Sequence, residues 1–345
     1  QTRLARSLVT CGLRRRYDLH PLLRQYTREK LATDLDTAKR ALLTAMLDFV
    51  TAQNERIAYD TYVAALDAIE VEHDNIRAAL EWALLDGRAP IDGARLAQAM
   101  FEFWNNRSHA TEAETVYTAA LRYNLPDHLQ AHIHIQRGRI RYRLADHLGI
   151  ARDVEAGLAL GEALGDNAII AHSLLNMEFT LARGDSEQKL ALMGRIQPHT
   201  EHSNDFKLLG RFHITAQIVH GSVDDFAQAH HHLDQAQHYF EAAGDLMGIS
   251  RVLYNRAITN KEQNPQENVR SLIQQSMDIK RQIGDRAGLA RRLSVLATYE
   301  IVDEEFEAAA RNLHESLRIC EDVGDRSRWA YTMAVRAMLD YIQGD

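Results

Sequence analysis

The sequence predicts an all-α protein, a superhelical solenoid of antiparallel helix pairs that follows a small N-terminal segment containing a β-hairpin. Proline and glycine are rare, with 5 and 18 among 345 residues. The long segments between them are rich in Ala, Leu, Arg, Glu and Gln, which favour helices. Apolar residues in these segments recur at a spacing near 3.6. Turn signals recur about every forty residues, which is typical of a repeat protein.

The forty-residue period is clearest in Gly-Asp pairs, which stand at 165–166, 244–245, 284–285 and 324–325, with Asn-Asp at 204–205. Glycine favours the left-handed residue that ends a helix, and the aspartate after it can cap the next helix. Further turn signals lie midway, so each unit is predicted to be a helical hairpin. One hairpin cannot bury both apolar stripes, so neighbouring units should stack. Breaks are expected near 165, 184, 204, 222, 244, 264, 284, 303 and 324, after a degenerate unit over 127–164.

Ahead of the repeats, the segment from Leu13 to Leu19 has strand-like alternation. Helices are expected over 37–58 and from about Asp74 to Leu85. We therefore divide the chain into an N-terminal remnant over 1–33, a helical arm with degenerate helix pairs over 34–124, and a repeat domain over 125–345 that stops mid-repeat. Because the first residues already follow a helical pattern, we expect this to be a fragment of a longer protein.

Composition and charge exclude several functional classes. A hydrophobic content of 46% excludes disorder, and no apolar run approaches the ~18 residues of a membrane span. The net charge of −8 argues against direct nucleic-acid contact. Cys11 and Cys320 are too far apart in the sequence for a disulfide framework or a zinc motif, and they favour a reduced, cytoplasmic setting.

The seventeen histidines do not predict a metal site. His128 and His132 share a helix face, as do His230, Asp234 and His238. No HExxH motif and no nearby cysteine accompany them, so exposed histidines on polar helices explain these spacings. We expect no metal.

Three arginines form the candidate binding site. Arg211, Arg251 and Arg291 are spaced by forty, at the same position of the first helix in three successive units. In stacked hairpins that position faces the concave groove, with adjacent helices ~10 Å apart, and Tyr254 and Tyr331 should project nearby. Arginines beside aromatic rings suit an acidic peptide or a phosphate. The alternative is that each arginine pairs with an acidic neighbour of its own chain.

The unit pattern resembles tetratricopeptide-like repeats of a longer, forty-residue kind. Leu293, Leu296 and Ala297 fall where the first helix of that family places large, large and small residues, and the small residue recurs as Ala257 and Ala337. The Trp and Tyr of the standard 34-residue motif are missing. The resemblance implies a superhelix in which first helices approach closely at the small residue.

Residues 12–33 resemble the last hairpin and helix of the winged-helix domain in STAND-class (NB-ARC-like) signal-transduction ATPases. In that family a hydrophobic-His-Asp motif opens the helix, and its His contacts the β-phosphate of ADP. Leu19 and His20 match this motif, whereas Pro21 replaces the Asp. Residues 70–84 resemble the helical arm that follows this domain. The resemblance implies that 1–33 is a winged-helix remnant and that His20 senses nucleotide in the full-length protein.

These observations predict the ligand- or partner-sensing repeat domain of a STAND-type signalling or transcriptional regulator. The chain contains no G-x-x-x-x-G-K-[ST] phosphate loop, so we expect neither catalysis nor a bound cofactor in it. ADP or ATP would bind the nucleotide-binding domain of the full-length protein, which the resemblance implies as one partner. The other expected partner is a protein, peptide or anionic ligand in the concave groove. The alternative is a free-standing helical-repeat scaffold or peptide receptor of the quorum-sensing type.

Overall fold

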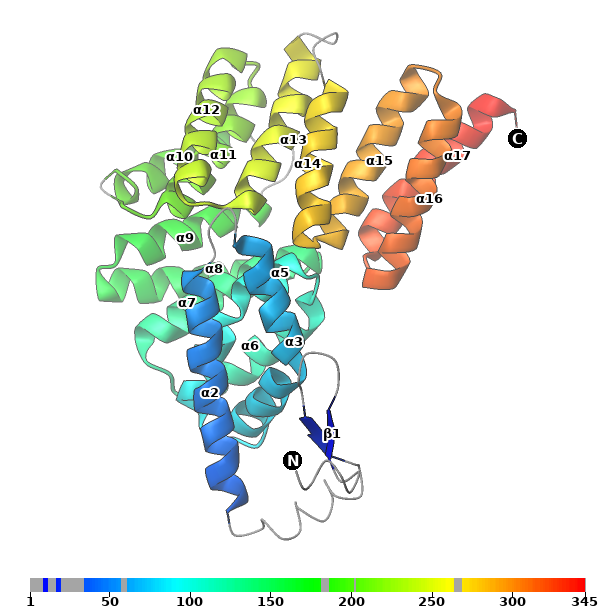
Figure 1. Ribbon diagram of the computed structural model, residues 1–345. Helices are drawn as coiled ribbons and strands as arrows, with labels where there is room; N and C mark the ends of the chain where they lie inside the picture. Colours follow the sequence, from blue (N-terminus) through cyan, green and yellow to red (C-terminus); the bar gives the residue numbers. More distant parts are fainter. Residues whose placement is uncertain are drawn as a thin grey trace.

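The computed structural model describes residues 9–11, 17–19, 34–56, 61–180, 186–201, 203–263 and 269–344. All described elements except one small hairpin are helices, so the all-α prediction is confirmed (Figure 1). The hairpin pairs β1 (Val9–Cys11) with β2 (Tyr17–Leu19) in antiparallel register. The described end of the predicted strand, Tyr17–Leu19, is a strand that pairs with Val9–Cys11, and residues 12–16 lie outside the described residues. His20 and Pro21, on which the predicted nucleotide contact depends, lie outside the described residues.

The N-terminal helices are α2 (Leu35–Glu55), α3 (Tyr62–Leu80), α4 (Pro90–Ala99), α5 (Phe101–Asn106) and α6 (Ala110–Ala120). Helix α2 matches the helix expected over 37–58. The helix expected over 74–85 is instead the end of a longer segment, α3 followed by the π-helical turn η2 (Glu81–Leu85). It begins earlier because Tyr62, Leu66 and Ile69 already form a buried stripe at helical spacing.

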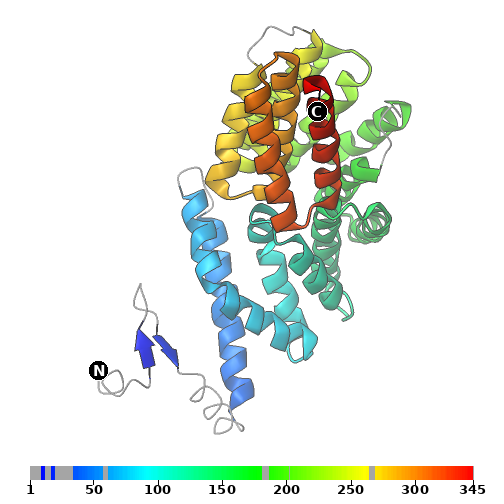
Figure 2. The ribbon, with the colours of Figure 1, turned by 90° about the vertical axis from the view of Figure 1, so that its right-hand side faces the viewer.

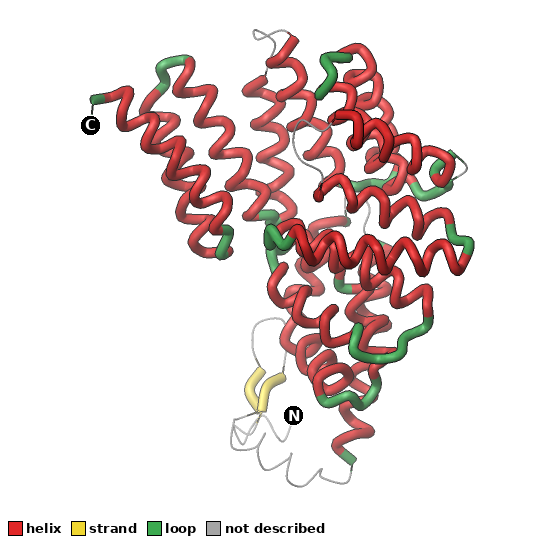
Figure 3. Tube along the Cα trace, turned by 180° about the vertical axis from the view of Figure 1, so that it is seen from behind, coloured by secondary structure: helices red, strands yellow, loops and turns green. Residues whose placement is uncertain are grey.

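Helix pairs follow one another through the repeats, as Figure 3 shows from behind. The expected breaks fall between helices or in 181–185 and 264–268, which lie outside the described residues. The 3₁₀ turns η3 (Glu178–Thr180) and η4 (Gln197–His199) extend two of the helices. The helices are α7 (Asp127–Arg143), α8 (His147–Leu164), α9 (Asn167–Met177), α10 (Ser186–Ile196), α11 (Phe206–Gly221), α12 (Phe226–Ala242), α13 (Leu246–Gln263), α14 (Val269–Ile283), α15 (Arg286–Val302), α16 (Phe306–Val323) and α17 (Arg326–Gln343).

The turns between units have the predicted chemistry. Their glycines adopt positive φ angles, from 61° at Gly244 to 74° at Gly284, which a residue with a Cβ atom adopts only at a cost. The aspartate that follows each of these turns accepts a hydrogen bond from a backbone N–H two or three residues on; these residues are Asp166, Asp205, Asp245, Asp285 and Asp325. Glycine and aspartate therefore end one helix and start the next.

The turns inside the units use left-handed residues other than glycine. Ala145, Asp224 and Glu304 have φ angles of 56°, 59° and 61°. Each lies just before the second helix of its unit, and Asp224 and Glu304 are related by the repeat. Because a Cβ atom clashes in this region, these positions store local strain.

Successive units wind into a superhelix, and the small position of the repeat is buried in two of them. Ala257 on α13 and Ala297 on α15 are both 0% exposed, as the predicted small position requires, whereas Ala337 on α17 is exposed. Within the described residues, no helix combines the length and apolar character needed to cross a membrane.

The superhelix turns far enough for its later units to meet the N-terminal helices. Helix α14 contacts α3, and Figures 1 and 2 both show the end of α14 next to the N-terminal helices. Ile283 and Leu246 belong to the same buried cluster as Tyr62. An ion pair between Lys207 Nζ and Glu102 Oε1, 2.8 Å apart, also joins α11 to α5. These contacts connect segments more than one hundred residues apart.

Candidate functional site

Helix α7 carries four arginines at alternate positions. Because two residues rotate a helix by about 200°, alternate arginines point to opposite faces. Arg137 and Arg141 turn to α8, where their guanidinium groups donate to the buried carboxylate of Asp153 at 2.6 Å and 2.9 Å. Arg139 and Arg143 occupy the opposite face and point into the superhelix, toward α5 and the later units. We call this side of α7, with the residues that it faces, the inner face.

Arg139 lies at the centre of the inner face. Its guanidinium stacks on the ring of Phe101, with 4.4 Å between the charge and the ring centroid. Burial lowers the pKa of Arg139, partly offset by Glu102 and Asp245, and the nearby charge of Arg251 lowers it further. Residues of α5, α7 and α13 are therefore close enough in space for their charges to interact.

The predicted arginines Arg211, Arg251 and Arg291 all face this region. Burial, followed by the charges of Arg139 and Arg251, lowers the pKa of Arg211 well below its usual value. In the described part of the chain, no carboxylate lies within 4.0 Å of the charged nitrogens of the three predicted arginines. The alternative of carboxylate pairing on the same chain is therefore not what the structure shows. Whether they bind a partner remains a prediction.

Arg211 has structural partners of its own. Its side chain is 9% exposed, and it bonds to Nδ1 of His172 at 3.0 Å and to Oδ1 of Asn176 at 2.9 Å, both on α9. Because Arg211 can only donate, His172 must accept through Nδ1, so its imidazole is neutral. Burial also lowers the pKa of His172, opposed by its bond to Asp205. Arg211 therefore ties α11 to α9.

Arg291 and Arg251 flank the phenol of Tyr142 at the end of α7. Arg291 forms a hydrogen bond with Tyr142. Burial acts to raise the pKa of Tyr142, but the charges of Arg291 and then Arg251 outweigh it and lower that pKa. Tyr142 is 37% exposed, so this edge of the cluster can be reached by solvent and by a ligand.

The two predicted tyrosines each stack under an arginine. Arg292 lies 4.2 Å from the ring centroid of Tyr254, and Arg328 lies 4.7 Å from that of Tyr331. Tyr331 on α17 is 43% exposed. Burial and then the charge of Arg291 lower the pKa of Arg328, so these two side chains are near enough for their charges to interact. We name the inner arginine cluster as Arg139, Arg211, Arg251, Arg291 and Arg328.

The carboxylates nearest to the cluster already have partners. Glu102 pairs with Lys207 at 2.8 Å. Asp245 caps α13 through the N–H of Gly248, and burial raises its pKa, opposed by the charge of Lys207. Glu178 accepts a hydrogen bond from Thr215 at 2.9 Å. Asp205 and Asp325, whose charges act on Arg211 and Arg291, cap helices. Among the described residues, none of these carboxylates forms an ion pair with a cluster arginine.

An open cavity of about 760 Å³ adjoins this region. Phe101 and Glu102 of α5 line it, together with Gln136 of α7 and Lys207 of α11, and residues of α2 and α4 complete its wall. Phe101 is the ring on which Arg139 stacks. No arginine of the inner arginine cluster lines this cavity, so its link to the cluster is the Phe101 ring.

No protein-family model and no curated protein sequence matches the chain. Among solved structures, the crystal structure of Rap protein complexed with competence and sporulation factor aligns with 89% of this chain and 99% of that chain, at a TM-score of 0.50 and 11% sequence identity. At this identity the likeness concerns the fold. The chain has the helical-repeat solenoid fold that is also found in the tetratricopeptide-like Rap protein.

Proposed function

We propose that this chain is a helical-repeat receptor that binds an acidic peptide, or an extended acidic segment of a protein, at the inner arginine cluster. The observation that carries the proposal is that Arg211, Arg251 and Arg291 lie near further arginines and form no ion pair with a carboxylate in the described part of the chain. The solved Rap protein with this fold is complexed with competence and sporulation factor, which supports a receptor role for the fold.

The chemistry of the cluster favours a carboxylate-bearing ligand. A guanidinium group offers paired N–H donors that match a carboxylate. Arg251 and Arg291 are half-buried, so they can make such bonds without the full desolvation cost of a core position. A bound carboxylate would also relieve their repulsion with Arg139. Each charge-assisted bond should contribute about 1.5–3 kcal/mol to binding.

Two pools of fluorescein-labelled decapeptides test this proposal by fluorescence anisotropy. The pools are identical except that every Asp and Glu of the first is Asn or Gln in the second. We expect the acidic pool alone to bind, more weakly as salt rises. An Arg251→Gln/Arg291→Gln variant should weaken binding at least tenfold.

The matched control is Arg311→Gln/Arg318→Gln, which removes the same charge from exposed positions of α16. It should bind like the unmodified protein. Equal binding of the two pools, or equal losses in the two double variants, would contradict the proposal.

The finer hypothesis is that this receptor is the sensor portion of a STAND-type regulator. It rests on the resemblance of Leu19-His20 and of residues 70–84 to that class. Under this hypothesis the chain itself performs no catalysis and binds no cofactor, and a ligand on the inner face changes contacts with a separate nucleotide-binding domain. The test is nucleotide content: His20→Ala in the full-length protein should reduce retained ADP. Unchanged ADP would remove His20 from the functional residues.

A further inference from the structure

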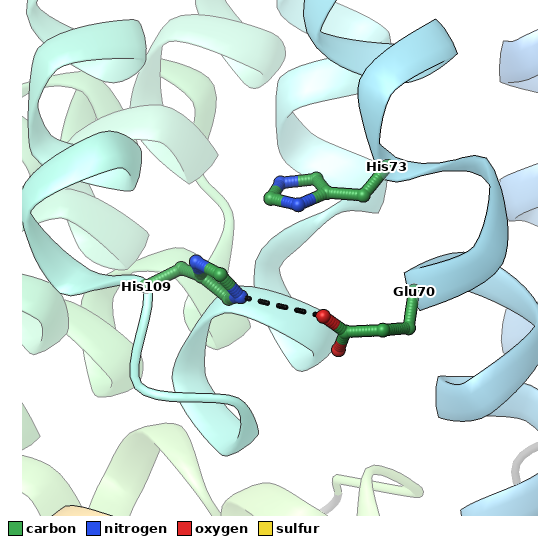
Figure 4. Close-up of side chains that lie close together, drawn as sticks. All are labelled: Glu70, His73 and His109. Carbon is green, nitrogen blue, oxygen red and sulfur yellow. Dashed lines mark ion pairs between the residues drawn. The ribbon is translucent and has the colours of Figure 1, made fainter.

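A second group of polar side chains lies where α3 meets the turn between α5 and α6 (Figure 4). Glu70 and His73 are one helical turn apart on α3, and His109 immediately precedes α6. One possible ligand atom from each of the three lies within 4.8 Å of the other two. The Nε2 atom of His109 is 4.0 Å from Oε1 of Glu70. Figure 4 shows the three side chains gathered around one point.

Glu112, in the first turn of α6, orients both imidazoles. Its Oε1 accepts a hydrogen bond from Nε2 of His73 at 2.8 Å, and its Oε2 lies 3.9 Å from Nδ1 of His109. The indole of Trp104 donates to the same carboxylate at 3.3 Å. Each imidazole therefore directs one nitrogen to Glu112 and has its other nitrogen, Nδ1 of His73 and Nε2 of His109, to offer to an ion. A carboxylate behind a histidine is the usual outer partner of a metal ligand.

Two arginines lie near the group, and each has an acidic partner outside the proposed ligand set. Arg107 has its Nε 4.0 Å from Glu70, but its Nη2 bonds to Asp67. Arg77 has its Nε 3.8 Å from Oε2 of Glu112. Glu70 is exposed, so its side chain can turn toward an ion.

We propose that Glu70, His73 and His109 bind a divalent transition-metal ion, with Zn²⁺ the best match and water as the fourth ligand. Two imidazoles and one carboxylate are a donor set that Zn²⁺ accepts. Tetrahedral bonds of roughly 2.0–2.1 Å place ligand atoms about 3.4 Å apart. The present spacing must therefore contract modestly, which the exposed Glu70 allows.

The ion would stiffen the turn that touches the later repeats. In this turn Ser108 has a φ angle of 63°, and its Oγ accepts a long hydrogen bond, 3.4 Å, from the backbone N–H of Ala287 at the start of α15. Arg107 packs so closely on Gly284 that a Cβ atom there would lie 2.6 Å from its Nη1. Fixing His109 to α3 should therefore hold the N-terminal helices against the α14–α15 turn.

Titration calorimetry with Zn²⁺ on metal-free protein, after removal of any histidine tag, tests the site. We expect one saturable site in the micromolar range or tighter, and a rise in melting temperature on saturation. Glu70→Gln and His109→Gln should each weaken this site at least tenfold, and Glu112→Gln about tenfold through loss of orientation.

The matched control is His128→Gln, at a histidine whose side chain is 63% exposed and whose Nδ1 lies 3.7 Å from Asp166. It should leave the Zn²⁺ affinity unchanged. Cobalt(II) absorption distinguishes ordered coordination from loose surface binding, because a four-coordinate site gives intense visible bands. No saturable site in the unmodified protein, or equal affinity in Glu70→Gln, His109→Gln and His128→Gln, would overturn the proposal.

Discussion

Arg143 on α7 donates from Nη1 to Oδ1 of Asp285 at the start of α15, across 3.2 Å in space and 142 residues of chain. Asp285 also accepts from Nζ of Lys280 at 2.9 Å and from the N–H of Gly288 at 3.0 Å. The side chains of Asp285 and Lys280 are 2% and 3% exposed. Asp285 therefore has two roles. It caps α15, and its ion pair with Arg143 joins two distant turns of the superhelix.

Asp285→Ala should destabilise the protein by about 3–5 kcal/mol, because it leaves the buried charge of Lys280 without its partner. Asp325→Ala is the matched control, since Asp325 caps α17 through the N–H of Arg328 in the same way but forms no ion pair among the described residues. It should cost about 1 kcal/mol. Urea unfolding measures both. Equal losses would mean that the cap alone accounts for the effect.

Arg211→Gln and Arg251→Gln should separate a structural arginine from a binding arginine. Loss of Arg211 leaves buried acceptor atoms of His172 and Asn176 without their donor. This should lower the free energy of unfolding by about 1–3 kcal/mol. Arg251 is only half-buried among like charges, so its replacement should change stability by less than about 1 kcal/mol. Thermal unfolding of the two variants provides the comparison. A larger loss for Arg251→Gln would show that this residue, too, is structural.

Stability should fall in mild acid because of a histidine pair between α11 and α12. The Nδ1 atoms of His213 and His232 lie 2.9 Å apart, and burial, followed by neighbouring histidines, lowers the pKa of each to about 4. The unfolded chain binds these protons near pH 6.5. The stability contribution is therefore complete above pH 6.5 and is lost progressively as the pH falls toward 4.

Denaturation midpoints between pH 7.5 and 4.5 measure this loss. His213→Gln should flatten the pH dependence, whereas His128→Gln, at an exposed position, should not. An unchanged slope in His213→Gln would exclude the pair as its source.

Glu304→Gly should stabilise the protein by up to about 1 kcal/mol, because glycine accepts the left-handed backbone without the clash of a Cβ atom. Glu304 has a φ angle of 61° and an exposed side chain. Thermal unfolding tests the gain. Glu307→Gly, inside the first turn of α16, is the control and should destabilise by a similar amount. A loss in both variants would contradict the strain at Glu304.

The repeat boundaries could be predicted from the sequence because they depend on local chemistry. The glycine and aspartate at 284–285 specify a left-handed residue and a cap whatever packs around them. The start of α3 lies earlier than predicted, although Tyr62, Leu66 and Ile69 recur at helical spacing. Which of these residues is buried depends on the other helices packed against them. The winged-helix assignment of residues 1–33 remains a prediction, since most of that segment lies outside the described residues.

The candidate site could be predicted only in part. The forty-residue spacing of Arg211, Arg251 and Arg291 predicts a shared face, but it does not reveal that Arg211 is bonded to α9. No arginine lies forty residues before or after Arg139, so the repeat spacing does not predict it. Arg139 lies near the other arginines because the superhelix curves back on itself. The sequence feature that points to Arg139 is the alternation of arginines from 137 to 143, which places Arg139 and Arg143 on one face of the helix. His109 lies 36 residues beyond His73 in the sequence, so their spacing does not indicate that the two side chains lie close together in space.

The contact between α3 and α14 changes how the chain should fold. In an open solenoid each unit touches only its neighbours, so folding can begin anywhere and spread, and the ends fray independently. Here Lys207 meets Glu102 and Arg143 meets Asp285, and both pairs must close long loops before they add stability. Unfolding of the N-terminal helices should therefore weaken α14 and α15 at once, so that one cooperative transition replaces stepwise loss from the ends.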